Sequence, residues 1–281
     1  MNIIDFKKLS KNKPVNFHRI ASFAKITKLD SKTLLQQALN QNVFAEKNTE
    51  LLSEFINSFD GKKNIQSQLF QDVFASFVIG DRFEKTFLEF GATDGFELSN
   101  TYMLESKLNW KGALSEPSPQ WHKSLKENRK NSKLITKCIW NKSEEKLDFF
   151  MSDNGAYSTL NDFIDNDKKS MPINNALRKK SGKLVTVETI SLNDVIKVYF
   201  DNVCPSYISI DTEGSEYEIL KSFNLEIYRP KLFTIEHNFT ENESKIDEHL
   251  ISHGYVRIFR KLTAFDAWYI PSEILLLKKG N

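Results

Sequence analysis

The 281-residue chain carries a formal net charge of +2 at pH 7, with 40% hydrophobic and 27% charged residues. This composition is typical of a globular protein and excludes a polybasic chain, so we expect no nucleic-acid partner. Cys138 and Cys204 have no metal-ligand spacing, and no stretch reaches the roughly 18 apolar residues of a membrane span. Since the segment MNIIDFKKLSKNK lacks a signal peptide's apolar core, the sequence predicts a cytoplasmic protein.

Residues 1–62 form a polar segment with helical patterning. Phe17, Ile20, Phe23 and Ile26 recur at helical spacing, and the runs LLQQAL and LLSEFI continue the pattern. No cluster of catalytic residue types occurs in this segment. The sequence therefore predicts a helical N-terminal extension, which could cap the fold, form a dimer or bind a partner.

From residue 63 to residue 281, segments of strand character alternate with helical segments. This order is typical of a mostly parallel sheet in an α/β domain. The expected strands are Thr86–Phe90, Gly112–Ser115, Lys133–Ile139, Tyr207–Ile210, Leu232–Ile235, Tyr255–Phe259, Ala267–Ile270 and Glu273–Leu277.

The last two expected strands are separated only by the turn at Pro271 and Ser272. A parallel connection needs about a dozen residues, so at least one of these strands must be antiparallel. The predicted fold is a Rossmann-like sheet, mostly parallel, with an antiparallel C-terminal hairpin. The segment Asp148–Lys183 is polar and poorly periodic, and its length favours a mobile lid that carries Tyr157 over a substrate.

The strongest local motif is FLEFGATDG at Phe87–Gly95, in which a strand leads into a turn with two glycines. Ligands of open α/β sheets bind at the carboxyl ends of strands, where Gly91 and Gly95 would let the backbone approach closely and Glu89 adds a carboxylate. The G-x-x-x-G spacing differs from the G-x-G-x-x-G of dinucleotide enzymes, which counts against a nicotinamide or flavin cofactor.

The next strand ends at Glu116, in the segment GALSEP. A carboxylate in this position can accept hydrogen bonds from both hydroxyls of a ribose. The alternative is a surface glutamate that precedes a helix, and the glycine motif favours the ribose-binding role.

Two later strands also end in groups that can titrate or bind metals. YISIDTEGSE places Asp211 and Glu213 at the end of one strand, and TIEHN places Glu236 and His237 at the end of the next. Asp211 can also be a helix N-cap. Because the unperturbed pKa of histidine lies near neutrality, His237 is the best candidate for a base.

Together these segments resemble the FkbM family of methyltransferases, over roughly residues 66–270. The matching motifs are Gln71-Asp72, FLEFGATDGFELSNTYMLE, WKGALSEPSPQWHKSLKENR, VETISLNDVI, YISIDTEGSEYEIL and Glu236-His237-Asn238. This ordered series is far more specific than a single glycine turn.

The resemblance implies a class I methyltransferase domain at 63–281 that binds S-adenosylmethionine and typically methylates a hydroxyl oxygen. Asn100 and Thr101 are then expected at the amino-acid end of the cofactor and Glu116 at its ribose. The full set of expected cofactor-binding residues is Gln71, Glu89, Gly91, Asp94, Gly95, Asn100, Thr101, Glu116 and Asp211.

Two mechanisms could activate an acceptor hydroxyl. In the first, the catalytic residues are His237, Asp211 and Glu213, with His237 or Asp211 as the base. In the second, Asp211, Glu236 and His237 bind Mg²⁺ or Mn²⁺, which holds two substrate oxygens.

The favoured acceptor is a sugar hydroxyl in a glycan or a glycosylated metabolite. A polyketide or other small-molecule hydroxyl is the alternative acceptor, and a non-catalytic S-adenosylmethionine-binding module is the rival function. The sequence leaves the oligomeric state open, a dimer included.

Overall fold

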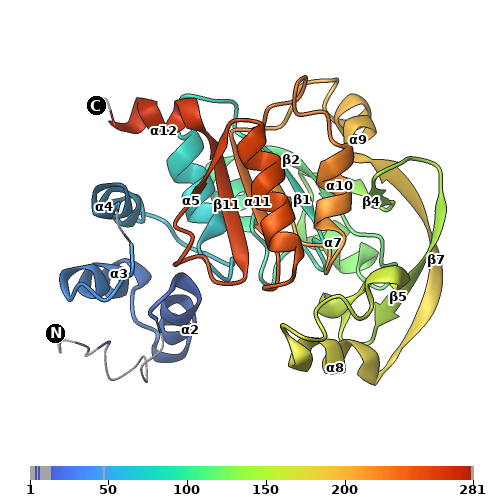
Figure 1. The fold of residues 1–281 in the computed structure, drawn as a ribbon, viewed down its shortest axis with the longest axis horizontal. Coiled ribbons are helices and arrows are strands. Elements are labelled where there is room, and N and C mark those ends of the chain that lie inside the picture. The colour runs from blue at the N-terminus through green and yellow to red at the C-terminus, as the bar shows by residue number, and fades with distance from the viewer. Residues whose placement is uncertain (1–3, 5, 7–13, 47, 280–281) are drawn as a thin grey trace.

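The computed structural model describes residues 4, 6, 14–46 and 48–279. Its central sheet has the strand order β10-β11-β9-β8-β1-β2-β3 (Figure 1). The strands are β1 (Thr86–Phe90), β2 (Lys111–Ser115), β3 (Lys133–Ile135), β8 (Tyr207–Ile210), β9 (Leu232–Glu236), β10 (Tyr255–Ile258) and β11 (Asp266–Pro271). All neighbours from β3 to β9 pair in parallel, whereas β11 is antiparallel to both β9 and β10. The predicted Rossmann-like sheet with an antiparallel C-terminal hairpin is confirmed.

The hairpin consists of different strands from those predicted. It pairs β10 with β11, and the segment Glu273–Leu277, predicted as a strand, lies in helix α12 (Ser272–Lys279). Leucine, glutamate and lysine are not branched at Cβ and have high helix propensity, and they dominate SEILLLKK. An apolar run of this length does not by itself distinguish a strand from a helix.

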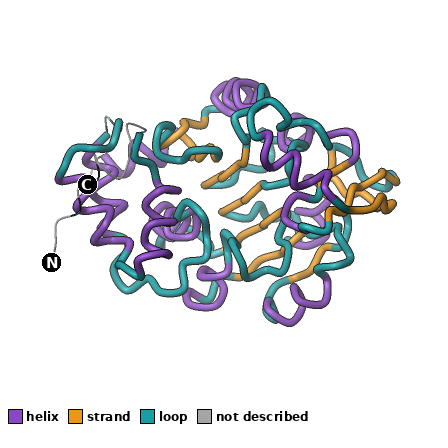
Figure 2. The backbone as a smooth tube through the Cα atoms, turned by 90° about the horizontal axis from the view of Figure 1, so that it is seen from below, coloured by secondary structure: helices purple, strands orange, loops and turns teal. Residues whose placement is uncertain are grey.

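Alternate residues of the central strands enter two separate cores, as the twofold period of a strand requires. Phe87 and Tyr207 pack into the core on one face, whereas Leu88 and Ile208 pack into the core on the other. Helices α5 (Gln71–Ile79), α6 (Tyr102–Leu108) and α7 (His122–Asn128) contribute to the first core. Helices α9 (Leu192–Tyr199), α10 (Glu216–Ser222) and α11 (Asn242–Ser252) contribute to the second. Figure 2 shows helices on both sides of the strands.

The N-terminal segment contains α2 (Phe17–Thr27), α3 (Ser31–Asn40) and α4 (Thr49–Asn57). Their N-cap residues Asn16, Asp30 and Asn48 each accept a backbone hydrogen bond, which explains where these helices begin. Their apolar faces join the first core, where Phe17 stacks on Trp268 with ring centroids 5.5 Å apart. The predicted extension also includes residues 1–3, 5, 7–13 and 47, which lie outside the described residues.

A second, four-stranded sheet with the order β4-β7-β5-β6 lies between β3 and α9 in the sequence. We call residues 138–191 the insertion. It contains β4 (Cys138–Trp140), β5 (Lys146–Ser152), η1 (Gly155–Tyr157), β6 (Thr159–Leu160), η2 (Asn161–Phe163), α8 (Pro172–Lys180) and β7 (Gly182–Ser191).

The structure of the insertion corrects two predictions. Asp148–Lys183 is not irregular, because β5 pairs with β7 over seven residues between Lys146 and Ser152. The single strand predicted at Lys133–Ile139 is two strands, of which β3 joins the central sheet and β4 joins the second. In the described ranges, no helix has the length and apolar character needed to cross a membrane.

Candidate active site

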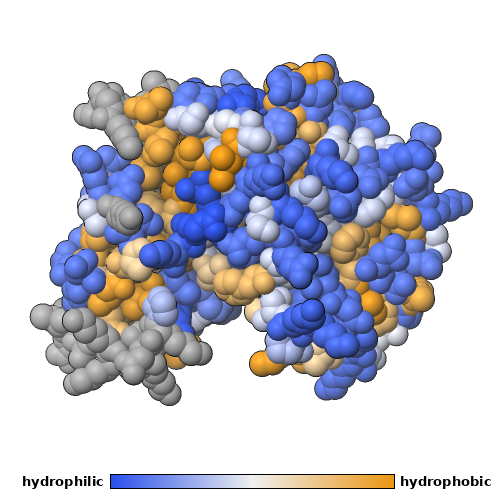
Figure 3. All heavy atoms as spheres, in the orientation of Figure 1, coloured by the Kyte–Doolittle hydropathy of each residue, from blue (hydrophilic) through white to orange (hydrophobic). Residues whose placement is uncertain are grey.

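A cavity of about 350 Å³ lies at the carboxyl ends of β1, β2, β8 and β9. Helix α2 contributes His18 to one side of it, and the insertion contributes Tyr157, Met171 and Asn174 to the other. Figure 3 shows a notch at the lower edge of the molecule, between the N-terminal helices and the insertion. Ligands of open α/β sheets bind at this end of the strands, so the cavity is the candidate active site.

The glycines of FLEFGATDG serve close packing within the protein. Gly91 has φ +66°, and a Cβ atom there would lie 2.0 Å from the backbone oxygen of Asp211. Gly95 has φ +74°, and its Cβ atom would meet Leu125 and Arg129 at 2.5 and 2.6 Å. Gly91 lines the cavity, whereas Gly95 does not. The structure therefore corrects the expectation that Gly95 lets the backbone approach a ligand.

Glu89, at the end of β1, holds the segment that follows the glycine turn. Its carboxylate accepts hydrogen bonds from the backbone N–H of Asn100 (2.7 Å) and from the hydroxyls of Ser99 and Thr101. The Arg129 guanidinium lies 3.6 Å from the same carboxylate. Asn100 is thereby fixed at the cavity wall, but Thr101 is fully buried outside it.

Glu116, at the end of β2, is a buried cavity carboxylate. Its two oxygens accept one backbone N–H each, from Thr93 (2.8 Å) and from Ser118 (2.8 Å). Burial raises the pKa of Glu116 to about 7, and the negative charge of Asp211 adds to the rise. A carboxylate oxygen can accept a second hydrogen bond, so Glu116 can still accept two ligand hydroxyls.

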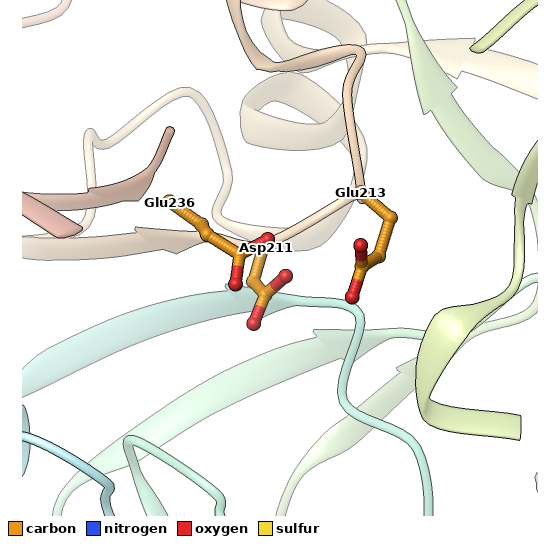
Figure 4. Close-up of side chains that lie close together, drawn as sticks. All are labelled: Asp211, Glu213 and Glu236. Carbon is orange, nitrogen blue, oxygen red and sulfur yellow. The ribbon is translucent and has the colours of Figure 1, made fainter. Parts of the chain in front are cut away.

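Three carboxylates gather where β8 and β9 end (Figure 4). Ligand atoms from Asp211, Glu213 and Glu236 all lie within 4.8 Å of one another. The Asp211 and Glu236 carboxyls also share a hydrogen bond. An all-oxygen set of this kind suits a hard cation such as Mg²⁺ or Mn²⁺.

Burial and mutual repulsion favour the neutral forms of these three carboxyls. Burial raises the pKa of Asp211 to about 7, against the opposing effect of its hydrogen bond with Glu236. Burial, followed by the charges of Asp211 and Glu213, raises the pKa of Glu236 well above its usual value. The hydrogen bond between the two carboxyls raises the pKa of Glu236 and lowers that of Asp211.

Glu213 is held by the insertion. The fully buried Arg178 donates to Glu213 (2.6 Å) and to Asp167 (2.6 Å), and also to the backbone oxygen of Tyr157 (2.8 Å). Glu213 has φ +59°, a conformation that costs free energy in a residue with a side chain and persists only when its surroundings enforce it. Arg178 and the hydroxyl of Thr159, which donates to the Glu213 backbone oxygen (3.1 Å), supply that enforcement.

His237 lies outside the cavity, which corrects the prediction that it faces the same cleft as Asp211. Its Nδ1 accepts the backbone N–H of Phe239 (3.1 Å), and its Nε2 lies 3.2 Å from the Arg257 guanidinium. Burial lowers the pKa of His237 to about 4. A ring with both nitrogens engaged behind the strand can neither take a proton from a cavity ligand nor bind a metal there.

The structure brings most of the predicted site residues to the cavity. Those that line it are Gln71, Glu89, Gly91, Asn100, Glu116, Asp211, Glu213 and Glu236. Those that do not are Asp94, Gly95, Thr101 and His237. Asp94 instead accepts the backbone N–H groups of Phe96 and Glu97 and so shapes the turn.

Sequence reasoning missed several lining residues. Asp266, at the start of β11, accepts a hydrogen bond from Gln71 (3.0 Å), and burial raises its pKa to about 7. His18 and Met171 come from segments that carry no motif. Asp266 reaches the cavity because β11 pairs with β9 and places Asp266 opposite Glu236, a register that only the structure shows.

Comparisons with known proteins show the family to which the chain belongs. The profile of the family described as "Methyltransferase FkbM domain" matches residues 89–257. No curated protein matches the sequence. Among solved structures, precorrin-6y C5,15-methyltransferase from Geobacter metallireducens GS-15 is similar, with 14% sequence identity and a TM-score of 0.37, over 70% of this chain and 76% of that chain.

Proposed function

This chain belongs to the FkbM methyltransferase family, and from that premise we propose that it transfers a methyl group from S-adenosylmethionine to a hydroxyl oxygen of a sugar. The observation that carries the proposal is the set of carboxylates around the cavity. Glu116 follows β2 and Asp211 follows β8, the two strands that flank β1, and no lysine or arginine is among the described lining residues. Such a cavity suits a cationic sulfonium and disfavours the phosphates of a dinucleotide.

The wall near Glu116 has the chemistry that a nucleoside needs. Pro117, Ile139 and Phe149 line the cavity beside it and offer an apolar surface for an adenine ring, while Glu116 would accept the ribose hydroxyls. Asn100 lines the cavity, where its side chain donates a hydrogen bond to Ser209 (3.0 Å). In this position Asn100 would meet the amino-acid end of the cofactor.

We expect the Glu116→Gln variant to bind S-adenosylmethionine about ten- to a hundred-fold more weakly than the wild type. Glutamine leaves one oxygen to accept hydrogen bonds where the carboxylate has two, so a ribose hydroxyl or a backbone N–H loses its partner. Isothermal titration calorimetry measures both dissociation constants. The control is Glu127→Gln on the exposed face of α7, which should bind as the wild type does. Equal affinity of both variants would remove Glu116 from the cofactor site.

Methyl transfer is an in-line displacement in which the bound sulfonium supplies the electrophilic methyl group. The protein must align the acceptor oxygen and accept its proton, because an alcohol is a weak nucleophile near neutral pH. A pKa of about 7, which balances basicity against ionisation, is shared by three cavity carboxyls, those of Glu116, Asp211 and Asp266. Glu116 is assigned to the ribose, and the Asp266 carboxylate accepts hydrogen bonds from Gln71 and Trp268, so we assign the proton to Asp211. Glu236 holds Asp211 through their hydrogen bond, and Arg178 holds Glu213 beside it.

A sugar fits the polar character of the remaining wall. Tyr157 and Asn174 from the insertion and Gln68 before α5 face the cavity with groups that donate and accept hydrogen bonds. A polyketide hydroxyl would gain less from these polar side chains. Methyl transfer from labelled S-adenosylmethionine to a panel of sugars and polyketides tests the acceptor class, and transfer to polyketides alone would contradict the proposal.

A divalent cation at Asp211, Glu213 and Glu236 is the second candidate mechanism, favoured by the closeness of their oxygens. We expect Mn²⁺ to bind the wild-type protein, and to bind the Glu236→Gln variant at least about ten-fold more weakly, as one carboxylate ligand is lost. Calorimetry with Mn²⁺ alone measures this difference. Loss of methyl transfer in EDTA with recovery in Mg²⁺ assigns the cation to the reaction, whereas full activity in EDTA leaves Asp211 acting as a base.

A further inference from the structure

Helix α2 is fixed against the edge of the cavity by the residue that begins it. The backbone N–H of Phe17 donates to the oxygen of Leu262 (2.9 Å), and its ring contacts Phe55 and Trp268 with centroids 5.6 and 5.5 Å away. Phe17 is completely buried. The next residue along the helix, His18, therefore has a defined place, and it lines the cavity.

His18 carries a polar atom that the protein does not satisfy. Its Nδ1 is buried and has no hydrogen-bond partner, while its ring packs edge-on against Phe265 at a centroid distance of 5.3 Å. Because Nδ1 has no exposed surface, a ligand in the cavity cannot reach it in this position. Nε2 is neither buried nor hydrogen-bonded to a described residue, so it is the ring nitrogen that a cavity ligand can meet.

The position of His18 assigns it to the acceptor rather than to the cofactor. His18 packs against the ring of Phe265. The carbonyl of Phe265 accepts the backbone N–H groups of His237 (2.9 Å) and Asn238 (3.2 Å), the two residues that follow Glu236. In the sheet order, β9 and β11 lie on one side of β8, and β1 and β2 with Glu116 lie on the other. The cavity wall at His18 is therefore the wall across from the proposed ribose site.

The charges that surround this wall restrict the acceptor. Glu236 and Asp266 line the cavity near His18, and the described lining residues contribute no basic side chain other than this imidazole. Burial and the neighbouring Arg19 lower the pKa of His18, so its ring is neutral near pH 7. A neutral imidazole both donates and accepts, which matches a hydroxyl, whereas a phosphate or carboxylate would find no cationic partner among the described lining residues.

We propose that helix α2 completes the acceptor site and that His18 hydrogen-bonds an acceptor of the neutral polyol class. This inference rests on the proposed methyl transfer and adds a substrate-binding residue to it. His18 lies outside residues 89–257, which match the family profile. The N-terminal helices thus supply acceptor recognition to a domain that already holds the cofactor and Asp211.

The test compares three variants of the full chain. His18→Phe keeps a ring against Phe265 but removes both nitrogens, and His18→Gln restores a polar atom near the position of Nε2. His253→Phe, at the end of α11 and outside the cavity, is the matched control. The probes are methyl glucoside, methyl mannoside and methyl galactoside, with glucose 6-phosphate and glucuronate as anionic counterparts.

We expect His18→Phe to lower kcat/KM for the best neutral glycoside at least about ten-fold, the effect of one lost hydrogen bond, and His18→Gln to recover part of it. His253→Phe should match the wild type, and all variants should keep their affinity for S-adenosylmethionine. In ¹⁵N-histidine NMR of protein saturated with S-adenosylhomocysteine, the His18 signal should shift with neutral glycosides and not with the anionic sugars.

Three kinds of failure are distinguishable. A wild-type protein that binds S-adenosylmethionine but shows no His18 shift with any glycoside, or a His18→Phe variant with unchanged kcat/KM, overturns the role of His18 and leaves the proposed function standing. A shift with the anionic sugars alone overturns the assignment of a neutral acceptor. Absence of S-adenosylmethionine binding by the wild type overturns both proposals.

Discussion

The Asp211→Asn variant is expected to lose about two to four orders of magnitude in kcat while it still binds S-adenosylmethionine. Asparagine has nearly the same shape as aspartate but cannot take a proton from the acceptor hydroxyl, and general-base catalysis contributes an effect of this size. The measurement is the methyl-transfer rate at saturating concentrations of both substrates, with the glycoside that the acceptor panel identifies.

The pH dependence of the wild type provides a second check on Asp211. Burial raises its pKa to about 7, and a base acts only when it is deprotonated. The value of kcat/KM should therefore rise with pH up to about 7 and then level off, and this rise should be absent in Asp211→Asn. The exposed Asp201→Asn variant is the control and should keep the wild-type profile. An Asp211→Asn variant with a third or more of the wild-type kcat would contradict the assignment of the base.

The Arg178→Met variant is expected to lose about 3–5 kcal/mol in the free energy of unfolding. Arg178 is completely buried and pairs with Asp167 and Glu213 at 2.6 Å each, so its removal leaves two buried carboxylates without a cation. Urea unfolding followed by circular dichroism measures the loss. Hydrogen exchange should locate the change in the insertion and in the loop around Glu213, because Arg178 connects the two.

Lys180→Met on the same helix is the matched control for Arg178→Met. Lys180 is exposed, and substitution there should change the free energy of unfolding by no more than about 0.5 kcal/mol. Adding Asp167→Asn to Arg178→Met should restore part of the stability, since it removes one of the two uncompensated charges. Equal stability of Arg178→Met and Lys180→Met would show that the buried pair does not hold the insertion in place.

Sequence reasoning identified the strands of the central sheet because their signals are local. A buried strand such as β8 is a short apolar run with turn residues at its end, and the same holds for β1 and β9. The residues that follow such strands could be placed at one edge of the sheet from strand order alone. This is why Glu116, Asp211 and Glu236 were found together in one cavity.

The errors arise where local sequence permits two outcomes. SEILLLKK is apolar enough for an edge strand, but it also has high helix propensity. In the structure this segment follows β11 as a helix. The insertion lacks clear periodicity because its second sheet is small and partly exposed, so alternation between polar and apolar faces is weak. His237 follows a strand in the expected way, but its side chain turns to Arg257 rather than to the cavity.

By itself, the sequence determined the class of fold, the methyltransferase family and the edge of the sheet that holds the site, since these depend on residue patterns along a continuous strand or turn. Only the tertiary structure decided which side chains enter the cavity. His18, Arg178 and Asp266 come from separate segments, and their contacts with Phe265, Glu213 and Gln71 form only when distant parts of the chain pack together. Side-chain direction at a strand end depends on these contacts, which explains why Glu213 and not His237 stands beside Asp211 and Glu236.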